Sequence, residues 1–184
     1  MTTLPLKGQD DPVYQAWVLL LNGYGFNWYR LDNQMRADDL LIRAKASEHL
    51  AEAAAALRRQ EAEFRRIHLP PPSREKPFPD PERLAELARL KRLQDRIATT
   101  DTKLRGAPVP ADDKIWARHR DELDSLTRLV QFDTILVGTT HRIAEAANAA
   151  GDGMPADAVI VEIEADLAVL EELLHQRGEL LAIR

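Results

Sequence analysis

The feature that most constrains this sequence is a long stripe of mainly apolar residues at helical spacing. Between residues 43 and 67 the stripe recurs at alternating steps of three and four positions. Residues spaced in this way share one face of an α-helix. The stripe consists of Arg43, Ala46, Leu50, Ala53, Leu57, Gln60, Phe64 and Ile67. With Asn27 as a capping residue, and Phe26 and Leu31 placed as a hydrophobic staple, the pattern predicts one helix of about 40 residues that ends near Ile67.

A second long helix is predicted between a proline and a glycine. Asp80-Pro81 is suited to start a helix, because the Asp side chain caps it and Pro fits its first turn. The apolar stripe continues through Leu90, Leu93, Ile97 and Leu104. Gly106 follows the stripe and is a residue type that commonly closes a helix.

The last third of the sequence predicts two more helices, separated by the segment GDGMPAD. The first runs from Asp112 or Asp113 to about Ala150, with two adjacent heptad rows. One row holds Trp116, Leu123, Val130, Val137 and Ala144, and the other holds His119, Leu126, Asp133, Thr140 and Ala147. The final helix has the cleanest seam, with Ile160, Ile163, Leu167, Leu170, Leu174 and, after Arg177, Leu181.

Prolines and glycines also define the remaining segments. Six prolines between Pro70 and Pro81 exclude a helix or a central strand, so residues 68–81 are predicted to form an extended connector. Asp11-Pro12 and Gly23 bracket a short, almost wholly apolar helix at about 12–22. No stretch shows strand-like alternation. We therefore expect a single all-α domain over residues 1–184, built as an elongated antiparallel bundle of four long helices plus the short N-terminal one.

Composition excludes several kinds of chemistry. The chain has no cysteine, so disulfides, cysteine-ligated metals and thiol catalysis are all excluded. The longest apolar run, Ala16 to Leu21, is far shorter than the roughly 20 residues of a membrane span. The first residues lack the pattern of a secretory signal, and the net charge is −5. We expect a cytoplasmic protein that binds neither membrane nor nucleic acid and needs no cofactor.

Charge is unevenly distributed along the chain. Residues 58–105 carry 13 basic and 8 acidic side chains, whereas residues 106–184 carry 7 and 15. This asymmetry predicts that the helix over 81–105 packs against the two helices that follow it.

Asp133 is the main polar candidate, because its heptad row otherwise faces the core. Burying a carboxylate costs several kcal/mol unless it is paired or protonated. Arg36 and Arg43 occupy heptad-equivalent positions in the long second helix. Two hypotheses follow: a buried Asp133–arginine pair that sets helix register, or a ligand pocket formed by His119, Asp133, Arg36 and Arg43.

Two other patterns are weaker. Glu172 and His175 have the E-x-x-H spacing of di-iron bundles, but such sites need a second pair, and the sequence has none, so we expect no metal site. The segment VGTTHR, residues 137–142, has poor helix propensity and predicts a bend or a close helix contact.

Aromatic residues cluster near the N-terminus, where six of the ten in the chain fall between positions 14 and 29. Trp and Tyr concentrate binding energy at interfaces. Five of them are candidate partner-binding residues: Tyr14, Trp17, Tyr24, Trp28 and Tyr29. The alternative is that they cap one end of the bundle.

The sequence as a whole favours a non-enzymatic helical bundle that acts through protein contacts, as an accessory subunit, adaptor or assembly factor. Homodimerisation through leftover seam surface is part of this hypothesis. The alternative is a bundle that binds a small ligand or a metal at a core polar site around Asp133 and His119.

Overall fold

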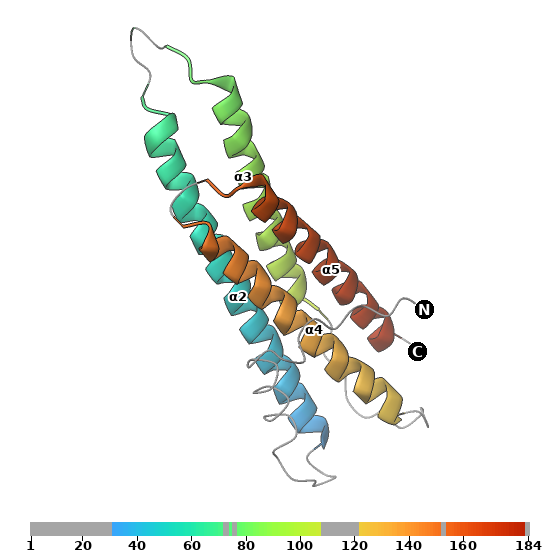
Figure 1. Cartoon of the computed structure of the whole chain (residues 1–184). Helices are drawn as coiled ribbons and strands as arrows, with labels where there is room; N and C mark the ends of the chain where they lie inside the picture. The colour runs from blue at the N-terminus through green and yellow to red at the C-terminus, as the bar shows by residue number, and fades with distance from the viewer. Residues whose placement is uncertain (1–30, 72–73, 75–76, 108–121, 152–153, 183–184) are drawn as a thin grey trace.

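The computed structural model describes residues 31–71, 74, 77–107, 122–151 and 154–182, apart from the side chains of 31–39, 122–127, 129–130 and 181–182. These ranges contain four α-helices and no strand: α2 (Leu31–His68), α3 (Pro81–Arg105), α4 (Glu122–Ala149) and α5 (Asp157–Ala182). Figure 1 shows them as one elongated bundle. The all-α prediction is confirmed for the described residues, whereas the short helix predicted at about 12–22 lies outside them.

Successive helices run in opposite directions, so the chain forms two antiparallel hairpins, α2–α3 and α4–α5 (Figure 1). The hairpins lie side by side, with α2 against α4 and α3 against α5. Helices of the same direction are therefore neighbours between the hairpins, and α3 and α4 occupy opposite corners. The charge distribution predicted that α3 packs against both α4 and α5. Among its main neighbours is α5, where Arg89 pairs with Asp157 at 2.6 Å and Arg96 with Glu171 at 3.1 Å, but not α4.

The predicted stripes form the core. In α2 the stripe is buried from Arg43 to Phe64, polar members included, and Leu50 and Leu57 are fully enclosed. The other buried seam residues are Leu90, Leu93, Ile97 and Leu104 in α3, Val137, Thr140, Ala144 and Ala147 in α4, and Ile160, Ile163, Leu167 and Leu170 in α5. Two predicted members of the stripes differ. Ile67 is 54% exposed, and Leu174 is only half-buried, whereas its neighbour Leu173 is 2% exposed.

The contacts of Gln60 explain why this polar residue is buried, and they also show where α4 ends beside α2. Its Nε2 donates to the carbonyl oxygens of Ala147 at 2.7 Å and Gly151 at 3.1 Å, at the C-terminal end of α4. The last carbonyls of a helix have no partner within the helix, so the bond to Ala147 satisfies a group that would otherwise be orphaned. The Oε1 of the same Gln60 side chain is buried without a hydrogen-bond partner among the described residues. Since α4 ends at the level of Gln60, the final two turns of α2 have no α4 residues to cover Ile67.

The ends of α3 match the predicted bounds. The Asp80 side chain accepts from the Glu82 backbone N–H at 2.9 Å, and Pro81 is the first helical residue. At the other end the Gly106 backbone N–H bonds to the Thr102 carbonyl at 3.0 Å. Both ends are therefore determined by local residues.

Truncating a core leucine and an exposed leucine of α3 should have different effects. Leu93 is 2% exposed and Leu84 is 42% exposed. Leu93→Ala should lower the free energy of unfolding by about 2–5 kcal/mol, because it removes buried contacts and leaves a cavity. Leu84→Ala should cost well under half of that in the same urea titration. Equal losses would contradict the assignment of the buried face.

Candidate functional site

Asp133 forms an ion pair at the interface between α4 and α5. Its Oδ1 accepts from Nε of Arg177 at 3.4 Å, and the two side chains are 12% and 3% exposed. Both residues also make further contacts within the chain. Arg177 is buried and Asp133 is half-buried, so the described geometry is that of a partly buried acid–arginine pair. The arginine comes from the position that interrupts the apolar seam of α5.

This pair occupies facing positions on two helix faces that pack in the bundle. Thr140 and Ala147, on the Asp133 row, are buried, as is Leu170 on the Arg177 seam. An unpaired charge at such a position would be strongly destabilising. Only a register that brings the two charges together avoids that cost, so the pair disfavours a shift of α5 along α4.

Arg43 is likewise buried, at 7% exposure, near the other end of α2 from Gln60. Its guanidinium donates through Nη1 to the Ala107 carbonyl, just after α3. Of the four residues in the predicted ligand pocket, only Asp133 and Arg43 have described side chains; Arg36 and His119 lie outside that set. The five candidate aromatic residues, Tyr14, Trp17, Tyr24, Trp28 and Tyr29, also lie outside the described residues.

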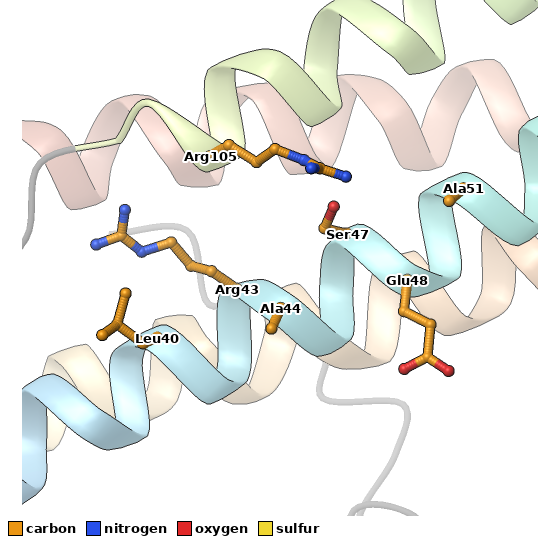
Figure 2. A pocket seen from close by; sticks show the side chains of 7 residues that line it. All are labelled: Leu40, Arg43, Ala44, Ser47, Glu48, Ala51 and Arg105. Carbon is orange, nitrogen blue, oxygen red and sulfur yellow. The ribbon is translucent and has the colours of Figure 1, made fainter.

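An open groove of about 430 Å³ runs between α2 and the end of α3. Its lining residues are Leu40, Arg43, Ala44, Ser47, Glu48, Ala51 and Arg105. Figure 2 shows Arg43 and Ser47 pointing from α2 toward α3, whereas Glu48 points away.

The polar groups of this groove are tied together within the chain. Ser47 Oγ donates to Asp101 Oδ1 at 2.5 Å, and Asp101 also accepts from Arg105 at 2.9 Å. The Ser47 proton is therefore directed to a carboxylate, and no histidine is among the lining residues to act as its base. The groove provides contact surface and two cationic side chains, and its lining lacks a serine–histidine nucleophile.

The polar contact that sequence reasoning missed lies between α2 and α4. His49 is 5% exposed, and its Nδ1 lies 3.2 Å from Thr140 Oγ1. Its ring also contacts that of His141, with 5.2 Å between the ring centroids. Burial is the main cause that lowers the pKa of His49, followed by the nearby charge of Lys45.

One sequence signal did point to this contact. The segment VGTTHR was predicted to form a bend or a close helix contact, and Thr139 and Thr140 are both fully buried. Thr140 contacts α2 through His49. The partner, His49, could not be chosen from the sequence because it flanks the α2 stripe instead of interrupting it.

The E-x-x-H pair is on the solvent side of α5, where Glu172 accepts from Gln176 at 2.6 Å and His175 lies 3.4 Å from Glu179. In the described part of the chain, no group of three or more His, Asp or Glu side chains could hold a metal ion. Within the same ranges, no helix combines the length and apolar character that a membrane crossing requires. Comparisons with protein-family models, curated proteins and solved structures gave no significant match.

Removing one partner of the buried ion pair should destabilise the protein strongly. Asp133→Ala leaves Arg177 without this carboxylate in an apolar interface, so the free energy of unfolding should fall by about 3–5 kcal/mol. The double variant Asp133→Ala/Arg177→Ala should lose less than the sum of the two single variants. Denaturant titration of the four species measures the coupling.

A surface pair on the same two helices is the matched control. Arg142 and Asp166 lie 2.8 Å apart across α4 and α5, but Arg142 is 44% exposed. Arg142→Ala should cost about 1 kcal/mol or less. If Asp133→Ala is no worse than Arg142→Ala, the buried pair does not determine helix register.

Proposed function

We propose that this protein is a non-enzymatic helical bundle that works through protein contacts, as an adaptor, accessory subunit or assembly factor. The observation that carries the proposal is Phe78, an aromatic side chain that is 83% exposed in the connector between α2 and α3. Exposed aromatic residues are the side chains most able to anchor an interface.

Phe78 stands on a part of the bundle that projects. Gln60 contacts the end of α4, and Arg89 contacts Asp157 at the start of α5. The last turns of α2, beyond Gln60, and the first turns of α3, before Arg89, therefore extend past the α4–α5 hairpin, as Figure 1 shows. Ile67 and Leu84, which are 54% and 42% exposed, lie on the same projection. A partner can reach these side chains without entering the bundle.

Two prolines restrict the backbone on either side of Phe78. Pro77 and Pro79 each have φ held near −65°, and a residue before proline is confined to extended conformations. Less backbone freedom is then lost when the aromatic ring is bound. This restriction supports Phe78 as a presented contact residue.

The polar side chains inside the bundle have contacts that fit a structural role. Asp133 is engaged by Arg177, Gln60 by the end of α4, and Arg43 by the Ala107 carbonyl. These contacts provide hydrogen-bond partners for side chains in the bundle interior. The alternative of a ligand pocket around Asp133 and His119 gains no additional support from the described contacts.

The proposal retains the N-terminal aromatic residues as a second contact region. It also includes a cytoplasmic location and self-association through leftover seam surface, both of which rest on the sequence pattern. Trp17→Ala and Trp28→Ala test the N-terminal region separately from Phe78, because each can be scored for binding and for melting temperature. An interface tryptophan should affect binding alone, whereas an end-cap tryptophan should lower the melting temperature.

Phe78→Ala should weaken partner binding and leave the fold intact. Proteins captured from cells of the source organism by the wild-type chain and by Phe78→Ala identify candidate partners, and calorimetry with each purified candidate gives affinities. The loss should be about 2 kcal/mol or more, the usual size for an anchor residue. The melting temperature should stay unchanged because the ring has few contacts within the chain.

Leu41→Ala is the matched control for this experiment. Leu41 is 61% exposed but lies toward the opposite end of α2. A candidate partner that binds wild type and Leu41→Ala equally, and binds Phe78→Ala much less, supports the proposal. If no purified candidate distinguishes wild type from Phe78→Ala, the projecting tip is not the interface.

A further inference from the structure

The outward charges of α3 and α5 have opposite signs. Basic side chains predominate among the exposed charged residues of α3, which are Lys91, Arg92, Lys103 and Arg105 against Glu82 and Asp95. In the described part of α5 no lysine or arginine is exposed, and the exposed carboxylates are those of Asp157, Glu162, Glu172 and Glu179. The two helices lie side by side and run in the same direction (Figure 1). This side of the bundle therefore has a basic half and an acidic half.

The charges that lie between α3 and α5 are paired within the chain, whereas the outward ones are not. Arg96 pairs with Glu171 at 3.1 Å across the two helices. In the described part of the chain, Arg92 and Lys103 of α3 have no ion-pair partner. Glu172 of α5 accepts only a neutral donor, Gln176 of its own helix, at 2.6 Å. The outward charges thus remain available to a second molecule.

Helical spacing gathers these charges on one surface together with small side chains. Residues at steps of three, four or seven positions share one face of a helix. Two stripes of exposed residues with this spacing form what we call the α3–α5 face: Ala85, Ala88, Arg92, Thr99 and Lys103 on α3, and Val161, Ala165, Ala168 and Glu172 on α5. Val161, the largest apolar member, is 54% exposed.

The contacts between the two helices show which residues stand at the same level along the bundle. Arg89 donates to Asp157 at 2.6 Å, and Arg96 donates to the Glu164 carbonyl at 3.3 Å, both over a separation of 68 positions. Farther along, Thr100 donates to Glu171 at 3.3 Å over 71 positions.

These separations match the charged residues of the two stripes. Arg92 stands at about the level of Glu162, and Lys103 stands at about the level of Glu172. Each basic residue of α3 therefore has an acidic residue of α5 at its own level.

Twofold symmetry converts this match into complementarity between two copies. Most protein dimers are symmetric, with the same patch used on both subunits. If two α3–α5 faces meet about an axis parallel to the helices, α3 of each copy lies against α5 of the other, and levels are preserved. Lys103 then meets Glu172 of the second copy, and Arg92 meets Glu162. An antiparallel dimer would place α3 against α3 and α5 against α5, so that like charges oppose each other, which costs several kcal/mol.

The size of the face suits a dimer. At about 1.5 Å per residue, the 25 residues of α3 span roughly 37 Å. Two helices about 10 Å apart present a strip roughly 20 Å wide. The face then covers on the order of 700 Å² per copy, within the roughly 600–1,000 Å² that each partner buries in a standard interface.

We propose that the α3–α5 face binds a second copy of this chain in a parallel, twofold-symmetric dimer, with Lys103–Glu172 and Arg92–Glu162 contacts between the copies. The inference rests on the self-association that is part of the proposed function, and it specifies the surface used. Because the copies are parallel, both projecting tips with their Phe78 side chains point the same way. The dimer would therefore offer a partner two anchors at one end.

The test is analytical ultracentrifugation of the full-length chain over a range of concentrations at low salt. We expect a monomer–dimer equilibrium whose dissociation constant rises with ionic strength, because salt screens exposed charges. Glu172→Lys and Lys103→Glu should each raise the dissociation constant by about tenfold or more, since each substitution opposes like charges twice in the symmetric interface. The melting temperature of each variant should stay near that of wild type because both residues are exposed.

Mixing the two variants provides the decisive measurement. A Glu172→Lys chain carries lysine at both positions, and a Lys103→Glu chain carries glutamate at both, so a mixed pair restores both contacts. The equimolar mixture should form heterodimers, and the double variant Lys103→Glu/Glu172→Lys should dimerise about as well as wild type. A merely structural effect of either substitution would not be rescued in this way.

Glu145→Lys is the matched control, because its side chain is 68% exposed on α4, away from the α3–α5 face. Its dissociation constant should stay within about twofold of the wild-type value. Phe78→Ala should also dimerise as wild type does, so failure of the dimer and failure of partner binding at the tip are separate results. The proposal is overturned if the wild type is monomeric into the millimolar range, if either charge-reversal variant dimerises as wild type does, or if their mixture forms no heterodimer.

Discussion

The bundle depends on the burial of one apolar stripe from each of its four helices. Leu50 and Leu57 of α2, Ile97 of α3 and Leu167 of α5 are fully enclosed. Each such side chain contributes about 1.5–3 kcal/mol of burial free energy, whereas a favourable helix-dipole interaction contributes about 0.3–1 kcal/mol. Parallel neighbouring helices place like ends of their dipoles side by side, which is slightly unfavourable. The larger burial free energy explains why α2 can nevertheless lie parallel to α4, and α3 parallel to α5.

Polar residues within the stripes select one arrangement among the many that would bury similar apolar area. Gln60 donates to carbonyls at the end of α4, and Asp133 accepts from Arg177 of α5. The first contact sets α2 along α4, and the second sets α4 along α5. Apolar contacts are non-directional, so these hydrogen-bonded contacts supply the specificity that the stripes lack.

The tip and the interior of the bundle differ in what a partner can reach. Phe78 stands on a tip that the α4–α5 hairpin does not reach, so a partner can contact it without entering the bundle. The His49–His141 contact, in comparison, lies within the interface of α2 with α4 and belongs to the packing of the two hairpins.

Local residues were sufficient to predict the elements. The periodicity of the stripes, the Asp80-Pro81 start and the Gly106 end of α3 all act over a few positions, and even the polar members Arg43 and Gln60 were correctly placed on the stripe. The prediction that Ile67 is buried was wrong. Periodicity shows that a residue lies on the stripe, but it does not show where the helix that covers the stripe ends.

For the described residues, the sequence by itself therefore determined which segments are helical and, apart from Ile67 and Leu174, which face of each is buried, since these depend on contacts between near neighbours in the chain. Only the tertiary structure decided that α2 lies beside α4, that Arg177 meets Asp133, and that His49 meets Thr140 and His141. His49 and Thr140 are 91 positions apart. An apolar stripe is buried equally well against several possible neighbours, so the identity of the neighbour, and every contact that follows from it, is a property of the assembled bundle.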